Sequence, residues 1–143
     1  MATETNPSIT VDFDSAVPVY RQIADEIRGL VARGELEDGA GLPSVRQLGS
    51  QVGVNLNTVA RAYRTLADEG LVELRQGASA RVRIPDAPYR SAMAPDDERR
   101  LDDLISRWVL AGADRKRIEE LIRGALDRFF AARAAGGADG GGA

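Results

Sequence analysis

Three short stretches with helical spacing of apolar residues, followed by two alternating stretches, limit the fold of this chain more than any other feature. The first helix is expected to begin near Pro18 and to end at Gly34. A loop over Gly39–Gly41 separates it from a second, short helix that begins at Pro43-Ser44. Asn55 can cap a third helix, which ends at Gly70. The inward faces of the three helices comprise Val19, Ile23, Ile27, Leu30 and Val31, then Val45, Leu48 and Val52, then Val59, Ala62, Tyr63 and Leu66.

The two alternating stretches are Leu71–Leu74 and Ala80–Ile84, and the segment Gln76–Ser79 between them predicts a β-hairpin. Three short helices followed by a hairpin is the order of a winged helix-turn-helix. In that fold the third helix lies in the DNA major groove and the hairpin is the wing. The predicted fold class is therefore mostly α with a small β-hairpin, a winged helix-turn-helix followed by a C-terminal two-helix hairpin.

The 143 residues include no cysteine and no histidine. Their absence excludes disulfides, thiol chemistry, Cys or His metal sites and any catalytic triad that uses His. We therefore expect no enzyme activity, no cofactor and no bound metal. No uninterrupted apolar run approaches the ~18 residues of a membrane span. The first residues lack the pattern of a signal peptide, so a cytoplasmic location is expected.

The net charge of −3 conceals an uneven distribution. Residues 39–84 carry six arginines and three acidic residues, whereas residues 1–38 carry three arginines and eight acidic residues. No acidic residue occurs from Gly39 to Ala67, a stretch that contains Arg46, Arg61 and Arg64. A basic segment between acidic flanks is typical of a surface that binds a polyanion such as DNA.

The chain divides into an N-terminal arm (1–15), the winged helix-turn-helix (16–85), a Pro-containing linker (86–95), a helical region (96–134) and a low-complexity tail (135–143). Asp114 is expected to cap the second helix of the helical region. Two helices alone cannot bury their apolar stripes well, so we expect a second copy of the chain to cover these stripes. The alternative is that the stripes pack against the winged domain of the same chain. The candidate dimerisation residues are Leu101, Leu104, Ile105, Trp108, Ile118, Leu121, Ile122, Leu126 and Phe129.

Several segments resemble, in order and at matching spacings, the DNA-binding domain of GntR-family bacterial transcription regulators. They are Val17–Ile23, Gly34–Leu36, Gly39, Leu42–Leu48, Gly53–Tyr63, Leu66, Glu69–Val72 and Arg75–Gly77, and the resemblance spans about residues 16–85, half the chain. The C-terminal pattern resembles the YtrA-like subfamily, whose short C-terminal part mainly dimerises. The wing departs from the family pattern, with Ser79 in place of a second glycine and Arg81 where an aromatic residue is common.

The residues that match the motif are candidates for DNA contacts. Ser44 begins the second helix, where backbone N–H groups can hold a phosphate, and Arg46 can reach a phosphate or a guanine. Asn55 can be only a cap or also a contact. Leu56 can touch thymine methyls or sit against the sugar backbone, and Arg64 can alternatively be a solvated surface side chain. Arg81 and Arg83 offer phosphate contacts along the wing. The full set is Ser44, Arg46, Asn55, Leu56, Asn57, Thr58, Arg61, Arg64, Arg75, Gln76 and Gly77.

The resemblance implies a sequence-specific DNA-binding regulator, a repressor that binds an inverted-repeat operator as a homodimer. A winged domain that binds other proteins rather than DNA is the alternative. A variant in which a small molecule releases the protein from DNA stays open, and the sequence identifies no effector.

Overall fold

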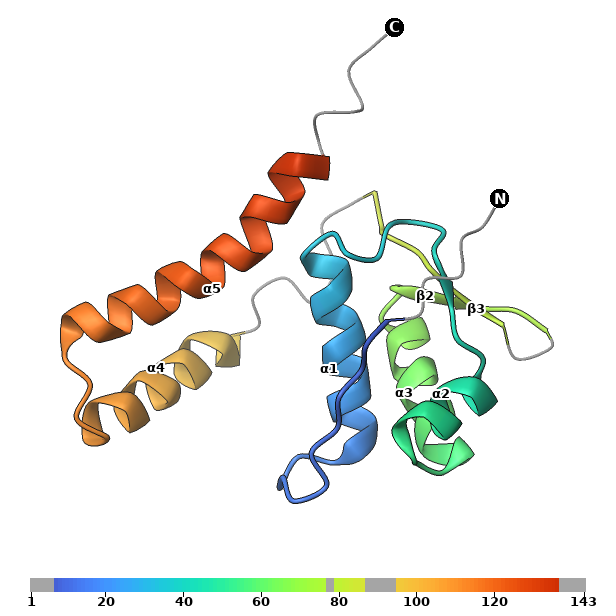
Figure 1. The fold of residues 1–143 in the computed structure, drawn as a ribbon, viewed down its shortest axis with the longest axis horizontal. Helices are drawn as coiled ribbons and strands as arrows, with labels where there is room; N and C mark the ends of the chain where they lie inside the picture. Colours follow the sequence, from blue (N-terminus) through green and yellow to red (C-terminus); the bar gives the residue numbers. More distant parts are fainter. Residues whose placement is uncertain (1–6, 77–78, 87–94, 137–143) are drawn as a thin grey trace, which may run out of the picture. The chain divides into compact units, whose positions relative to one another are not determined.

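The computed structural model describes residues 7–76, 79–86 and 95–136, and the chain forms two compact units, Met1–Ala87 and Pro88–Ala143 (Figure 1). Within these described ranges no helix is long and apolar enough to cross a membrane.

The first unit contains three helices and three short strands in the order that the hydrophobic pattern predicts, with one strand added. The elements are α1 (Val19–Ala32), β1 (Gly41–Leu42), α2 (Val45–Val52), α3 (Leu56–Asp68), β2 (Val72–Leu74) and β3 (Ala80–Val82). The winged helix-turn-helix predicted from the sequence is therefore confirmed.

The sheet contains the predicted hairpin, formed by β2 and β3, and adds the strand β1 to it. Its strands lie in the order β1-β3-β2, and both pairs are antiparallel, with Val72 opposite Val82 and Leu42 opposite Ala80. The backbone N–H of Val82 donates to the Ala40 carbonyl at 2.9 Å, and the N–H of Gly39 donates to the Val82 carbonyl at 2.8 Å. The expected loop at Gly39–Gly41 thus leads into an edge strand. This strand pairs with the backbone N–H and C=O groups on the edge of β3 that β2 does not cover.

The core of the first unit lies between α1 and α3, with α2 and the sheet packed around them. Its fully buried side chains are Ile23, Ile27, Leu36, Leu48, Val59, Tyr63, Leu66 and Val82. At the edge of this core, Arg28 of α1 forms an ion pair with Glu69 at the end of α3, with Nη2 and Oε1 2.8 Å apart. This half-buried pair joins the two helices that contribute most of the core.

Part of the predicted N-terminal arm is hydrogen-bonded to α1. The Gln22 side chain accepts from the Asp12 N–H at 2.8 Å and donates to the carbonyls of Asp12 and Val17 at 2.9 and 2.8 Å. One side chain of α1 therefore fixes the path of the chain before the helix. The sequence interpretation of a loose arm did not include the hydrogen bonds between Asp12 and Gln22, because these two residues are ten positions apart.

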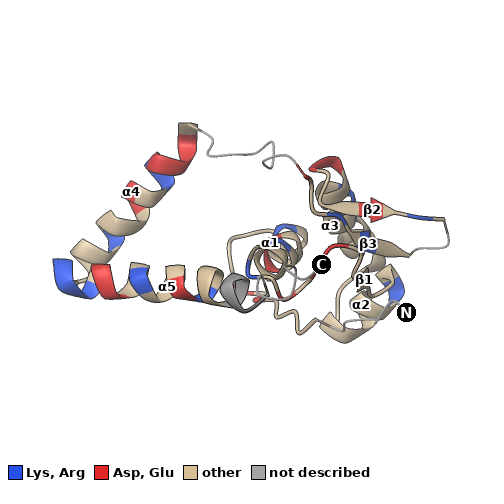
Figure 2. Cartoon of the chain, turned by 90° about the horizontal axis from the view of Figure 1, so that it is seen from above, with Lys and Arg blue, Asp and Glu red and all other residues tan. Residues whose placement is uncertain are grey.

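The second unit consists of α4 (Pro95–Leu110) and α5 (Arg115–Gly136). Asp114 caps α5 as predicted, because its carboxylate accepts from the Arg117 N–H at 2.8 Å. Figure 2 shows the two helices diverging from the turn that joins them. No residue of α4 is buried, and Ile118 is the buried apolar residue of the described part of α5.

Candidate nucleic-acid interface

The start of α2 is fixed by a reciprocal pair of hydrogen bonds. The Ser44 hydroxyl accepts from the Gln47 N–H at 3.1 Å, and the Gln47 side-chain oxygen accepts from the Ser44 N–H at 2.9 Å. This capping box sets the direction in which the first turn of α2 emerges. The exposed side chain of Arg46 lies in that turn. It forms no ion pair with an acidic residue in the part of the chain that the structure describes.

The turn between α2 and α3 depends on two glycines. Gly53 has φ +74°, a left-handed conformation that side chains disfavour. Gly49 lies where a Cβ would approach the Val54 carbonyl oxygen to 3.1 Å and Leu56 Cδ2 to 3.3 Å. The two helices therefore approach closely, and the start of α3 lies beside α2.

The start of α3 presents polar side chains to solvent. The Asn55 side-chain oxygen accepts from the Asn57 N–H at 2.8 Å and caps the helix as predicted. Asn55, Leu56 and Asn57 are exposed, and Thr58 is half-buried. Since the inner face of α3 is buried in the core, Asn57, Arg61 and Arg64 follow one another at spacings of four and three along the outer face.

Arg61 is placed by a residue of α1 that the sequence interpretation did not single out. Its guanidinium carbon lies 3.9 Å from the centre of the Tyr20 ring. Stacking uses the flat face of the guanidinium and leaves its in-plane N–H groups available to a phosphate. The pairing spans 41 positions, so no local pattern in the sequence predicts it.

A part-buried hydrogen bond connects α3 to the residue before the α2 cap. The Tyr63 hydroxyl donates to the Pro43 carbonyl at 2.6 Å. Burial raises the pKa of Tyr63 well above its usual value, so the hydroxyl keeps its proton. Pro43 therefore acts through the backbone, by holding the start of α2 against α3.

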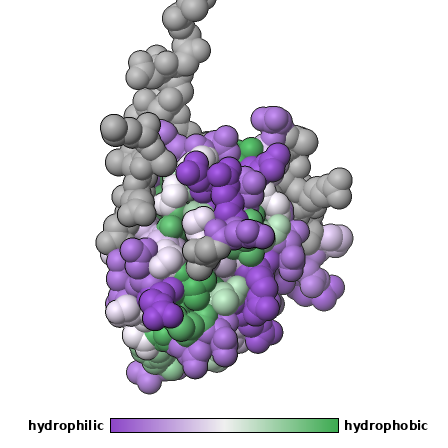
Figure 3. Space-filling model, turned by 90° about the vertical axis from the view of Figure 1, so that its right-hand side faces the viewer, coloured by the Kyte–Doolittle hydropathy of each residue, from purple (hydrophilic) through white to green (hydrophobic). Residues whose placement is uncertain are grey.

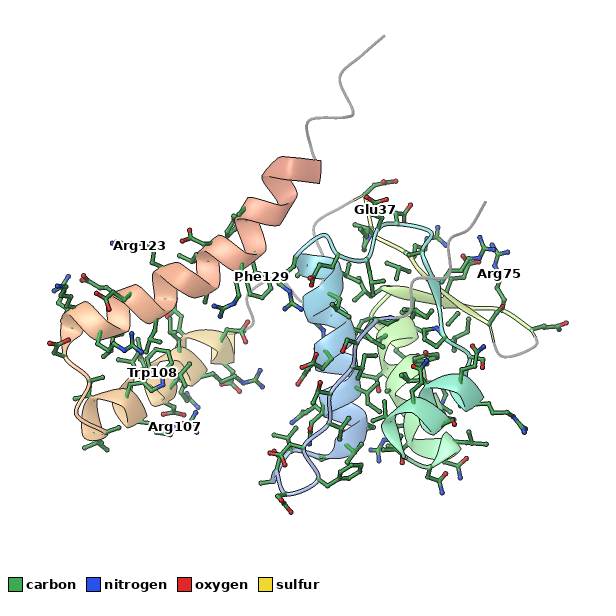
Figure 4. All side chains as sticks on the ribbon, in the orientation of Figure 1. Glu37, Arg75, Arg107, Trp108, Arg123 and Phe129 are labelled. Atoms are coloured by element: carbon green, nitrogen blue, oxygen red, sulfur yellow. The ribbon has the colours of Figure 1, made fainter. Side chains whose placement is uncertain are left out.

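The wing carries exposed Arg75 and Gln76 at its described tip, and Figure 4 shows Arg75 projecting from this hairpin. The Arg75 N–H donates to the Ser79 carbonyl at 3.0 Å, and its guanidinium lies 4.0 Å from the Glu73 carboxylate. The predicted contact Gly77 falls outside the described residues. Arg83 is exposed, whereas Arg81 is half-buried and lies opposite Glu73 in the sheet.

The predicted contacts therefore come from three places in one unit: the first turn of α2, the outer face of α3 and the wing. Figure 2 shows basic segments at α2 and on the wing. In Figure 3, hydrophilic surface surrounds a smaller apolar area on one side of the molecule. Tyr20, Gln47 and Gly49, which position this surface, were missed, and Tyr63 was predicted as a buried residue of the third helix but not as a hydrogen-bond donor to Pro43. Only Gln47 had a sequence signal, the Ser-x-x-Gln pattern of a capping box.

A family model described as bacterial regulatory proteins, gntR family, matches residues 19–82. The solved structure of YtrA from Sulfolobus acidocaldarius, a GntR-family transcription factor, is 37% identical to this chain. The alignment covers 72% of this chain and 97% of that one, with a TM-score of 0.51. The chain belongs to the GntR family.

Two further proteins are similar to this chain. The HTH-type transcriptional repressor YtrA of Bacillus subtilis (strain 168) is 39% identical over 69 residues, which are 48% of this chain and 53% of the repressor. A transcriptional antiterminator from Listeria monocytogenes EGD-e is 25% identical, with a TM-score of 0.70 and coverage of 87% of this chain and 95% of that one. The chain spans about half the length of the curated relatives it matches.

Proposed function

We propose that this GntR-family chain is a transcription regulator that binds a specific DNA sequence as a homodimer and represses by occupying the site. The observation that carries the proposal is the outer face formed by α2 and α3. There, Arg46 of α2 and Asn57 and Arg64 of α3 are exposed, and they lie within a 29-residue stretch that lacks acidic residues. Cationic side chains supply the salt-dependent affinity for phosphates, and the amide can distinguish an adenine.

The capped helix starts add the orientation that sequence-specific binding needs. Arg46 lies in the first turn of α2, and Asn57 lies in the first turn of α3. In helix-turn-helix proteins the N-terminal part of the second helix of the motif contacts base edges, and phosphate contacts fix the register. We therefore assign Asn57 to base recognition, and Arg46 and Arg64 to contacts with the DNA backbone or a guanine.

Binding of the full chain to DNA tests the proposal. Duplexes enriched by the protein from a random pool are labelled, and their affinity is measured by fluorescence anisotropy over a salt series. We expect tight, sequence-selective binding that weakens with salt and that Arg46→Ala reduces at least tenfold. Arg99→Ala is the matched control, because Arg99 is an exposed arginine in the other unit. Weak binding that is indifferent to sequence and to Arg46 would refute DNA recognition and favour a protein-binding role.

The second unit supports the homodimer. Among the described residues of α4 and α5, Leu101, Leu126 and Phe130 are 49%, 51% and 61% exposed, respectively. Two diverging helices with such faces gain most by covering them with the same faces of a second copy. A dimer also places two recognition helices on one DNA, which matches the two halves of an inverted repeat.

Sedimentation equilibrium tests this part independently of DNA. We expect twice the chain mass of 15.3 kDa for the wild type and the single-chain mass for Leu101→Glu combined with Leu126→Glu. Lys116→Glu, an exposed substitution in the first turn of α5, is the control and should stay dimeric. A wild-type protein that sediments as a monomer at high micromolar concentration would refute the homodimer.

A further inference from the structure

Leu56 is an apolar side chain in a polar setting at the start of the recognition helix. It is the first residue of α3 and is 43% exposed, between the exposed amides Asn55 and Asn57. A single exposed leucine is ordinary on a protein surface. This one differs because it stands at the end of the helix that is expected to face base edges.

The position of Leu56 is fixed by the neighbouring helix. Gly49 of α2 has no side chain, and a Cβ built there would lie only 3.3 Å from Leu56 Cδ2. The leucine therefore rests against the backbone of α2 on one side and meets solvent on the other. The exposed part of the side chain presents an apolar surface at the start of α3.

The major groove offers one distinctive apolar group on the bases, the C5 methyl of thymine. Leucine has no hydrogen-bonding atom, so it cannot recognise the donors and acceptors on the other base edges. Contact with a methyl group buries apolar surface on both sides. We propose that Leu56 is a specificity-determining residue that selects a thymine by its methyl group.

This inference rests on the proposed function, because it assigns a base preference to the same α3 surface. Asn57 follows Leu56 directly and can pair with the N6 and N7 atoms of adenine. The first turn of α3 thus combines an apolar reader of thymine with a polar reader of adenine. A·T pairs are accordingly the expected sequence beneath this end of the helix.

Replacement of thymine by uracil tests the inference, because uracil differs from thymine only by the missing methyl. The full chain first selects duplexes of about 30 base pairs, roughly three helical turns, from a random pool. Each thymine of the enriched duplex is then replaced singly by uracil, and the affinity is measured by anisotropy. Loss of one buried methyl should weaken binding about fourfold at one thymine in each half-site.

Variants assign the methyl contact to its side chain. Leu56→Ala should bind the thymine and uracil duplexes equally well at that position. Leu74→Ala is the matched control, since Leu74 is a leucine of the same unit with 45% exposure, and it should keep the uracil sensitivity. Thermal unfolding of each variant establishes that it is folded before its affinity is compared.

The outcomes separate the two proposals. If the wild type binds a selected sequence but no uracil replacement weakens binding, or if Leu56→Ala keeps the sensitivity, the methyl contact is refuted and the DNA-binding function stands. A leucine that lies against the sugar backbone would give this result. If no sequence is enriched, the proposed function fails, and the methyl contact fails with it because Leu56 would have no base to read.

Discussion

Replacement of Tyr63 by phenylalanine isolates one part-buried hydrogen bond that holds the α2–α3 arrangement together. Tyr63 is 1% exposed, and its hydroxyl donates to the Pro43 carbonyl at 2.6 Å. Phenylalanine keeps the ring and its packing, so little apolar burial is lost. The change removes the hydroxyl and leaves a carbonyl without this donor, directly before the cap of α2.

The expected cost follows from these two facts. A typical intramolecular hydrogen bond contributes about 0.5–1.5 kcal/mol net, and a buried acceptor left without a partner costs about 1–3 kcal/mol. Because the Pro43–Tyr63 contact is only partly buried, water can recover some of the loss. We therefore expect a loss of about 1–2 kcal/mol in the free energy of unfolding, which lowers the Tm by roughly 5–15 °C for a unit of this size.

Urea and thermal unfolding followed by circular dichroism measure this loss on the full chain. Tyr20→Phe is the control, because the Tyr20 hydroxyl makes no hydrogen bond to any residue that the structure describes. We expect that variant to stay within about 0.5 kcal/mol of the wild type, as surface changes usually do. Equal stability losses in the two variants, or no loss in Tyr63→Phe, would refute the assignment of the bond.

Three further predictions follow from single contacts. Because burial raises the pKa of Tyr63, the folded state keeps a proton that the unfolded state releases above about pH 10. The stability that this proton contributes is fully present below that pH and is lost as the pH rises beyond it. In Tyr63→Phe, the free energy of unfolding should therefore depend less on pH in this range. Tyr20→Leu should weaken DNA binding about two- to fivefold through loss of the stack on Arg61 and should have no effect in an Arg61→Ala background, as a double-mutant cycle of anisotropy measurements would show. Gly49→Val should destabilise the protein in thermal unfolding, whereas Gly29→Ala, where the nearest atom belongs to the flexible Arg33 side chain, should not.

Local signals in the sequence predicted the helices because their ends are determined by nearby residues. Asn55 and Asp114 accept hydrogen bonds from backbone groups two and three residues away. Apolar spacing also selected the buried face of α3 correctly, because Val59, Ala62, Tyr63 and Leu66 are buried. These features require no knowledge of which elements pack together, and a single sequence is enough to infer them.

Features that depend on distant partners were not predictable in the same way. The two-residue strand β1 has no alternation of its own and exists because β3 offers an open edge 40 residues later. The Tyr20–Arg61 stack and the Arg28–Glu69 ion pair likewise join residues that are 41 positions apart. The stack and the ion pair both depend on the packing of α1 against α3. The order of the elements suggests this packing, but the residue types do not specify it.

The caps also answer a question that the sequence left open, whether a capping residue can contact DNA as well. The Ser44 hydroxyl accepts a hydrogen bond from Gln47, and its own proton stays available for donation. The Asn55 oxygen is occupied by the Asn57 N–H, but its amide group still has two donors. Phosphates need donors, so the side-chain atoms that cap the helices differ from those that would bind a phosphate under the proposed function.

Because capping and the proposed DNA contacts involve the same side chains, only some substitutions can show whether a residue contacts DNA. A change at Ser44 or Asn55 removes a helix cap, which costs about 1 kcal/mol of stability, together with any phosphate contact. Weaker DNA binding by such a variant would therefore not distinguish contact from folding. Arg46, Asn57 and Arg64 have exposed side chains with no capping role, so a loss of affinity at these positions with unchanged Tm would report directly on recognition.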